Sequence, residues 1–247
     1  MASRDDVIAY ANELLRLDDF PDYGPMGLQV AGAEKVHRIG CAVSASLELF
    51  ERAAEAGVDL LLVHHGLFWD SDPRIIDDRM RRKLEALFGA RMSLAAYHLA
   101  LDAHPEIGNN ALLARDLGVE VEAPFAGIGV GGRIPGGIAA EAFVERVAER
   151  VGRTPTAFLE GPGHVKRVAI ITGGAARYVN DAAREGYDTF VTGEPAEPTL
   201  HTARELGIHF VAAGHYATER LGVQALAARL GERFGLEWEF LELPNPV

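Results

Sequence analysis

One supersecondary unit recurs three times in this chain of 247 residues and restricts the fold more than any other feature. The copies are AAEAGVDLLLVHH, AAREGYDTFVTGE and ARELGIHFVAAGH. Each runs from the tail of a helix through a glycine (Gly57, Gly186 or Gly207) into a short apolar strand with a polar end. Helices and strands alternate along most of the chain, which predicts an α/β fold with largely parallel sheets.

The length suffices for two units with separate cores. We predict two interlocked α/β domains, residues 1–125 with 212–247 and residues 126–211, and a metal site in the cleft between them. Ser3 with Asp6 is expected to cap the first helix. A helix over residues 74–90 is expected to present one apolar face, formed by Ile76, Met80, Leu84 and Leu87.

Charge and cysteine content narrow the class of protein. Acidic residues outnumber basic ones by 36 to 24, a net charge of −12, which makes bulk nucleic-acid binding unlikely. The single cysteine, Cys41, cannot form an internal disulfide, which is typical of a reducing compartment. No apolar run approaches the ~20 residues that span a bilayer. Since the first residues form an acidic amphipathic helix and no signal peptide, we predict a cytoplasmic protein without membrane contact.

Metal-ligand residue types follow three of the predicted strands. His64 and His65 end the strand LLLVHH. In open α/β sheets, ligands bind at the carboxyl ends of the strands. Two pairs with a spacing of four, which share one face of a helical turn, also follow strands. The pairs are His98 with Asp102 and His215 with Glu219.

Six imidazole and carboxylate groups without a thiolate indicate zinc, iron or manganese. A carboxylate that bridges two ions about 3.5–4 Å apart, with imidazoles around them, forms a centre that activates a shared water. Each residue alone also has a structural interpretation. A histidine at a strand end is often only hydrogen-bonded, Asp102 could be a helix N-cap, and Glu219 could be solvated.

Two glycine-rich segments could bind phosphate. GIGVGG, residues 127–132, matches G-x-G-x-x-G, but RIPGG follows it where a helix should start, which favours a strand or turn. Gly173 and Gly174 lie between a strand and a helix, where backbone amides could hold a phosphate. A tight strand-to-helix turn is the simpler interpretation.

A few other side chains have undetermined roles. Glu194 occupies the same register as His65 and His215, so it is a candidate for the metal cleft, with Glu197 and His201 nearby. Phe68 and Trp69 would pack in a pocket wall, a subunit contact or the core.

Several longer segments resemble the type-two GTP cyclohydrolase homologue family, also called the NIF-three-like dinuclear-metal family. They are GLQVAG, LLLVHHGLFW, AAYHLALDAHPEIGNN, VTGE and AAGHYATERLGV, and the resemblance runs from about Met26 to about Leu221. HHG-x-FW and GHY-x-TE are its specific blocks. This chain has PDYGPM where the family has a Trp-x-Asn approach to GLQV, a difference that affects an entrance loop, and it lacks a long central insertion.

The resemblance implies two divalent transition-metal ions per chain, a toroidal homohexamer and a cytoplasmic location. Its ligands, carried over by position, are His64, His65, Asp102, His215 and the bridging Glu219. His98 corresponds to a further histidine near the metals, as a ligand, a proton shuttle or a substrate contact.

The family name implies that GTP is hydrolysed, with opening of the guanine imidazole ring by a metal-activated hydroxide at C8. His98 would transfer protons. The same centre could instead hydrolyse a phosphoester or an amide of another small molecule. A third alternative is a non-enzymatic hexameric scaffold or metal-delivery protein.

Overall fold

The computed structural model describes residues 1–247, which form two compact units. The first unit comprises Met1–Leu101 and Gly222–Leu243, and the second comprises Asp102–Leu221 and Pro244–Val247. The boundaries differ from those expected from the sequence, since residues 102–125 and 212–221 belong to the second unit. Strand β7 (Glu120–Phe125) pairs with β8 (Gly129–Ala139) there, and Ala217 packs against the core of the same unit.

A five-stranded sheet organises the first unit. Its order is β13-β4-β5-β6-β2, in which all pairs are parallel except β6 with β2. The strands are β4 (Arg38–Ser44), β5 (Leu60–His65), β6 (Ser93–Ala96), β13 (Glu237–Phe240) and β2 (Gly27–Val30). A separate antiparallel pair joins β1 (Ala2–Ser3) and β3 (Lys35–Val36).

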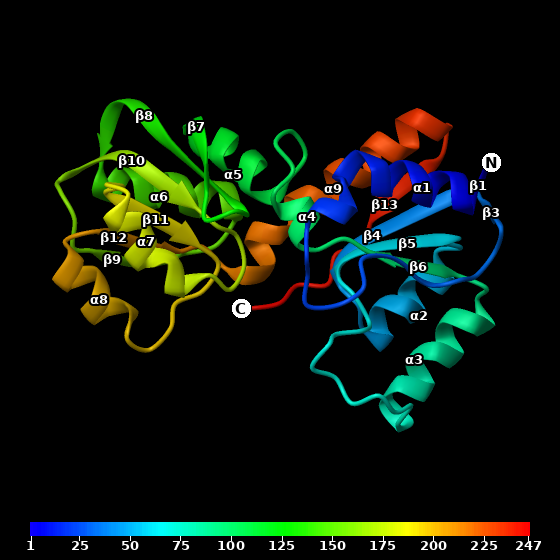
Figure 1. Ribbon diagram of the computed structural model, residues 1–247. Helices are drawn as coiled ribbons and strands as arrows, with labels where there is room; N and C mark the ends of the chain where they lie inside the picture. Colours follow the sequence, from blue (N-terminus) through cyan, green and yellow to red (C-terminus); the bar gives the residue numbers. More distant parts are fainter. The chain divides into compact units, whose positions relative to one another are not determined.

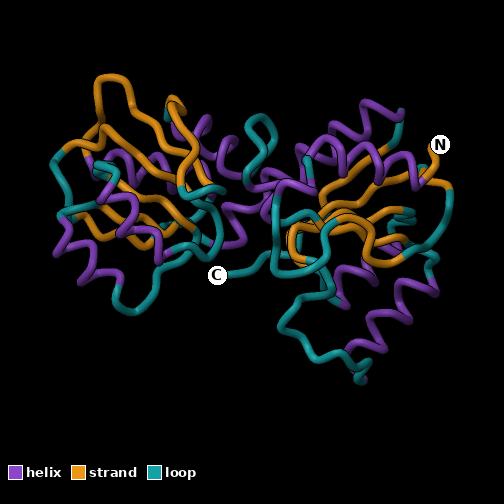
Figure 2. The backbone as a smooth tube through the Cα atoms, in the orientation of Figure 1, coloured by secondary structure: helices purple, strands orange, loops and turns teal.

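Helices cover both faces of this sheet (Figures 1 and 2). Helix α1 (Arg4–Leu15), followed by η1 (Leu17–Asp19), lies on one face with the part of α9 (His215–Phe234) that belongs to this unit. Helices α2 (Leu47–Glu55) and α3 (Asp78–Gly89) lie on the other. Phe50 of α2 and Leu87 of α3 share a core with Leu61, so alternate residues of the buried strands face different helix pairs.

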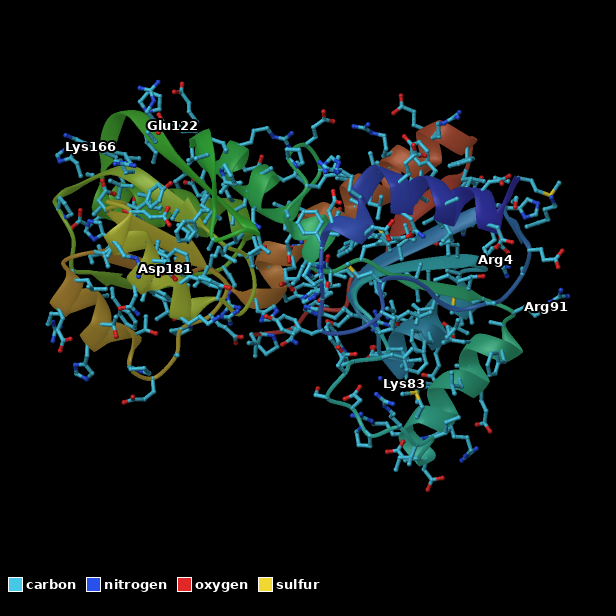
Figure 3. The ribbon with its side chains drawn as sticks, in the orientation of Figure 1. Arg4, Lys83, Arg91, Glu122, Lys166 and Asp181 are labelled. Atoms are coloured by element: carbon cyan, nitrogen blue, oxygen red, sulfur yellow. The ribbon has the colours of Figure 1, made fainter.

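The second unit contains a six-stranded mixed sheet of order β7-β8-β10-β11-β12-β9. Strands β10 (His164–Ile170), β11 (Thr189–Thr192) and β12 (His209–Ala212) are parallel, whereas β7, β8 and β9 (Thr156–Leu159) run antiparallel to their neighbours. The predicted α/β fold is therefore confirmed, and antiparallel strands flank the parallel centre of this sheet. Glu122 and Lys166 point away from it (Figure 3).

Its helices again lie in two layers. Helices α5 (Asn109–Leu117) and α6 (Ala140–Val151) share a core with β8 and β10. Helices α7 (Val179–Arg184), which follows η2 (Ala176–Tyr178), and α8 (Thr199–Leu206) pack on the opposite face, against Phe190 and Phe210. The short helix α4 (Leu99–Asp102) ends at the first residue of this unit.

Helix ends and strands were predicted correctly where a glycine or an apolar run marks them in the sequence. Gly57, Gly186 and Gly207 have φ of +69°, +79° and +64°, the left-handed conformation expected of glycines that end helices. The segment GIGVGG leads into strand β8, as the interrupted motif predicted.

Two details of the predicted helices were wrong. Ser3 precedes α1 but makes no side-chain capping bond. Helix α3 begins at Asp78 and not at residue 74, because the Asp77 side chain accepts a hydrogen bond from the Met80 amide (2.7 Å) and caps it there. Ile76 consequently lies outside the helix and is 70% exposed. No helix in the structure is both long and apolar enough to cross a membrane.

Candidate metal centre

Strand β5 places two histidines at its carboxyl end in the first unit. Parallel neighbours β4 and β6 cover both edges of this strand, and its five residues from Leu60 to His64 are buried. His64 is fully buried, whereas His65, one residue further, is partly exposed. The two side chains are adjacent, with ring centroids 4.9 Å apart.

His98 joins these two histidines from the next strand. It lies two residues after the end of β6, and its ring centroid lies 5.0 Å from that of His64 and 5.5 Å from that of His65. One ring nitrogen from each of the three lies within 4.8 Å of the others. We call these residues the histidine triad.

Hydrogen bonds to Nδ1 orient the rings of the triad. His64 Nδ1 lies 2.9 Å from the backbone oxygen of Tyr97, and His98 Nδ1 lies 2.7 Å from Oδ1 of Asp22. Both partners only accept hydrogen bonds, so each Nδ1 carries the proton in the neutral ring and Nε2 carries the lone pair. His65 Nδ1 lies 3.0 Å from the Ser44 hydroxyl, which can donate or accept.

Asp102 is the first candidate ligand of the second unit. It is buried at the end of α4, and its Oδ1 accepts hydrogen bonds from Asn109 Nδ2 (2.8 Å) and Thr172 Oγ1 (3.2 Å). One of its oxygens lies within 4.8 Å of a carboxylate oxygen of Glu219, which is also buried. Asp102 is therefore held by fixed donors beside a second acidic group and does not cap a helix N-terminus.

His215 begins helix α9 and Glu219 lies one turn further. His215 Nε2 is 3.2 Å from Oε2 of Glu219, and His215 Nδ1 is 3.1 Å from Oε1 of Glu194. Burial alone would lower the pKa of His215, but hydrogen bonds and charges from Glu219 and then Glu194 raise it to about 9. Glu194 thus takes the place of an orienting carboxylate behind His215.

The turn after β10 is shaped by these carboxylates. A Cβ on Gly173 would overlap Oε1 of Glu219, and a Cβ on Gly174 would lie 2.8 Å from Oε1 of Glu194. Gly173 also has φ of +68°, which disfavours residues with a side chain. The two glycines form the tight strand-to-helix turn considered above, and the space beside them is filled by Glu219 and Glu194.

Four other residues singled out in the sequence have different environments. Glu197 and His201 are exposed. Phe68 and Trp69 are half-buried rather than exposed: Phe68 packs against the core of the first unit, and Trp69 lies edge-on to His98 with centroids 5.2 Å apart.

Three orienting residues were not identified from the sequence: Asp22, Asn109 and Thr172. Asp22 lies in the segment PDYGPM, which the family resemblance indicates only as an entrance loop. Burial would raise the pKa of Asp22, but the hydrogen bond and charge of His98 lower it below its usual value. Asn109 is the first residue of the NN pair after PEIG. Its side-chain amide lies only seven positions from Asp102, so the sequence could have indicated it as a hydrogen-bond donor to that carboxylate.

The donor chemistry of each unit suits a transition metal. The first unit contains three clustered imidazoles, of which two have their lone pair on Nε2. The second unit, taken by itself, contains one imidazole and two buried carboxylates. The only thiol, Cys41, is buried within β4. Nitrogen and oxygen donors with hydrogen-bonded partners behind them are typical of zinc, iron and manganese sites.

These features define an α/β protein with candidate metal-binding clusters. The family model Duf34/NIF3 (NGG1p interacting factor 3) matches residues 2–246, and the chain belongs to this family. The chain is 43% identical, over 98% of its length and 97% of the relative's, to the GTP cyclohydrolase 1 type 2 homolog of Pseudomonas aeruginosa.

Solved structures agree with this assignment. A structure titled protein ybgI, unknown function, has a TM-score of 0.96 at 40% identity and covers both chains fully. The structure of TTHA1606 from Thermus thermophilus has a TM-score of 0.93 at 40% identity, also over the full length of both chains. The recognition made from the sequence motifs is therefore confirmed.

Proposed function

We propose that the chain is a hydrolase that depends on two divalent transition-metal ions, zinc, iron or manganese, held by His64, His65, Asp102, His215 and Glu219. The observation that carries the proposal is that hydrogen bonds and packing already orient the atoms that would bind the metal. His64 Nε2 has its lone pair because Tyr97 O occupies the other nitrogen, and Glu219 lies against a glycine where a larger residue would not fit.

Each residue has a definite task in this proposal. Asp102 would bind through a carboxylate that Asn109 and Thr172 hold in place, and His215 would bind through Nε2, with Glu194 behind Nδ1. Glu219, buried near both Asp102 and His215, is the carboxylate best suited to bridge. When bound, the ions would lower the pKa of water and polarise the scissile bond. His98 accepts and returns the proton at Nε2.

GTP is the first substrate to test, because relatives carry the name GTP cyclohydrolase 1 type 2 homolog. Water would add at C8 of guanine, the C8–N9 bond would break, and N9 would take a proton, which leaves an opened ring with a formyl group. A phosphoester is the alternative substrate of the same centre. The competing non-enzymatic role is a metal-binding scaffold or delivery protein.

The proposal is tested by metal content and hydrolysis measured on the same samples. Protein purified without chelator is expected to approach two transition-metal ions per chain, and the loaded protein to hydrolyse one member of a panel of nucleotides and phosphoesters. Saturation at one ion would contradict the dinuclear centre. Two ions without turnover on any substrate of the panel would favour the scaffold.

Two variants separate metal binding from catalysis. Glu219→Gln removes a negative charge between two dications, so both ions are expected to bind more weakly. His98→Ala is expected to keep most of the metal and to lose roughly 10²–10⁴-fold in turnover. A His98→Ala variant with full metal and full activity would remove His98 from the mechanism.

A further inference from the structure

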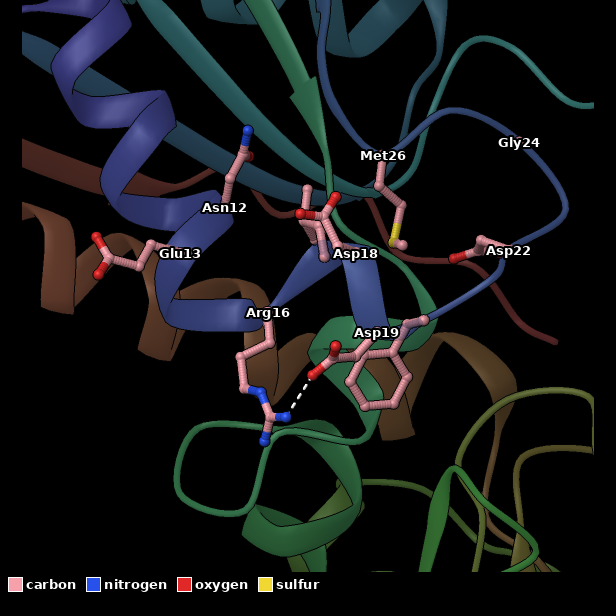
Figure 4. A pocket seen from close by; sticks show the side chains of 10 residues that line it. Asn12, Glu13, Arg16, Asp18, Asp19, Asp22, Gly24 and Met26 are labelled. Atoms are coloured by element: carbon pink, nitrogen blue, oxygen red, sulfur yellow. Dashed lines mark ion pairs between the residues drawn. The ribbon is translucent and has the colours of Figure 1, made fainter.

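Asp22 is the buried acid that contacts His98. It lies in the loop between η1 and β2, with 2% of its side chain exposed. Figure 4 shows it at the wall of a pocket of about 880 Å³, which is also lined by Asn12, Asp18 and Met26. No strand or helix contains this segment, which is held by a backbone hydrogen bond from the Asp70 amide to the Tyr23 oxygen (2.8 Å) and by the contacts of the Asp22 side chain.

Three donors converge on the two oxygens of this carboxylate. Oδ1 accepts from the Tyr23 amide (2.7 Å) and lies 2.7 Å from His98 Nδ1, while Oδ2 accepts from the Leu99 amide (2.9 Å). The bond to Leu99 matters because that residue follows His98 directly in the chain. Asp22 therefore holds both the ring and the adjoining backbone, which leaves the ring little freedom to rotate.

The identity of the partner atom determines the form of the imidazole. An ionised carboxylate has no proton to donate, so a neutral His98 must donate from Nδ1 and carry its lone pair on Nε2. Without an acceptor at Nδ1, no contact selects the Nδ1–H form. A carboxylate in this position also stabilises the imidazolium that forms when Nε2 accepts a proton, the role of the aspartate in serine-protease triads.

We infer that Asp22 is a positioning residue, which fixes His98 as the Nδ1–H tautomer and orients its Nε2 lone pair. The importance of Asp22 for catalysis rests on the proposed function, in which His98 Nε2 accepts a proton. The tautomer itself depends only on the first unit, which contains both residues. It can therefore be measured without metal or substrate.

The experiment is nitrogen-15 NMR of the full chain, labelled at its nine histidines and freed of metal by chelation, at pH 8. Two-bond proton–nitrogen correlations distinguish Nδ1–H, Nε2–H and the doubly protonated ring, and the spectrum of His98→Ala identifies the signals of His98. The wild type is expected to show the Nδ1–H pattern alone. In Asp22→Ala this pattern is expected to lose its dominance, because no acceptor selects it.

Asp18→Ala is the matched control, because Asp18 lines the same pocket and makes no hydrogen bond to His98. It is expected to retain the wild-type pattern, and circular dichroism checks the fold of both variants. An Nε2–H or doubly protonated His98 in the wild type would overturn the inference, as would a folded Asp22→Ala with an unchanged pattern. If Asp22→Ala does not fold, the wild-type spectrum decides. A hydrolase assay that fails would leave this result untouched.

Discussion

Hydrogen bonds to individual histidine rings distinguish a group of residues oriented to bind metal from a chance group of polar side chains. His64, His98 and His215 each have an acceptor at Nδ1, although the three acceptors come from different parts of the chain: Tyr97, Asp22 and Glu194. A chance cluster has no reason to repeat this arrangement. The repetition indicates selection for one ring orientation, with Nε2 as the atom that acts.

Gly173 provides a prediction at this scale. Gly173→Ala is expected to displace Glu219, because the new Cβ would overlap Oε1, and thereby to weaken metal binding by roughly 10-fold or more. The strained φ of +68° also costs about 1 kcal/mol of unfolding free energy. Metal titration and thermal unfolding measure the two effects separately.

Gly207→Ala is the control for that strain. Gly207 has φ of +64° in the same unit, and a Cβ there would meet nothing within 4 Å. It should lose similar stability and keep wild-type metal affinity. Equal metal affinity in both variants would show that Gly173 is required only by the backbone conformation.

At the scale of helices and strands, the sequence was most informative where the signal was local. The strand ending in His64 and His65 could be predicted because an apolar run follows a helix-ending glycine, Gly57. Strand β7 was missed because it lies at a sheet edge with five of its six residues exposed, so no apolar pattern marks it. Its pairing with β8 places residues 120–125 in the second compact unit, whereas the sequence predicts them in the first domain.

The candidate ligands were identifiable for the same reason, since each lies at the end of a strand or within one helical turn of a histidine that follows a strand. Two of the supporting residues, Asp22 and Thr172, were not identifiable, because their contacts join distant parts of the sequence. Asp22 and His98 are separated by 76 positions, and Thr172 and Asp102 by 70. Only a folded backbone brings such pairs together, and neither spacing nor composition encodes the contact.

Strand β4 gives a prediction at the scale of one element. It pairs with both β13 and β5, and it buries Cys41 between Phe240 and Leu62. Burial, and to a smaller extent the charge of Glu239, raises the pKa of this thiol to about 12 from 9.0. The thiolate is the reactive form, so the folded chain at pH 8 should contain about 10³-fold less of it than the unfolded chain.

A thiol reagent is therefore expected to label Cys41 only as denaturant opens the sheet. The same pKa shift makes the free energy of unfolding depend on pH. The contribution of the Cys41 thiol to stability is complete below pH 9, where the thiol is neutral in both the folded and the unfolded state. It is lost as the pH rises toward 12, because the unfolded chain ionises first. Labelling rates across a urea series provide the measurement. Rapid labelling of the native protein would mean that β4 is accessible and that the sheet edge at β13 opens readily.

For the whole molecule, the open question is assembly. We predict a homohexamer, as the resemblance implied. The surface of the first unit includes large apolar side chains that are exposed in the single chain. Among them are Ile75, Ile76 and Phe88, whose exposed fractions are 67%, 70% and 60%. Burial of such a side chain at an interface contributes about 1.5–3 kcal/mol, so several per chain would favour association at micromolar concentration.

Static light scattering of the purified chain measures the assembly directly. The expected mass is that of six 26.6 kDa chains, unchanged on dilution through the micromolar range. Ile76→Asp is expected to lower that mass, since a carboxylate in an apolar interface loses its hydration without gaining a partner. Arg184→Asp, a charge change at the exposed end of α7, serves as the control for charge alone and should leave the mass unchanged. A wild-type chain that scatters as a monomer at micromolar concentration would contradict the prediction, because the exposed isoleucines would then remain in water.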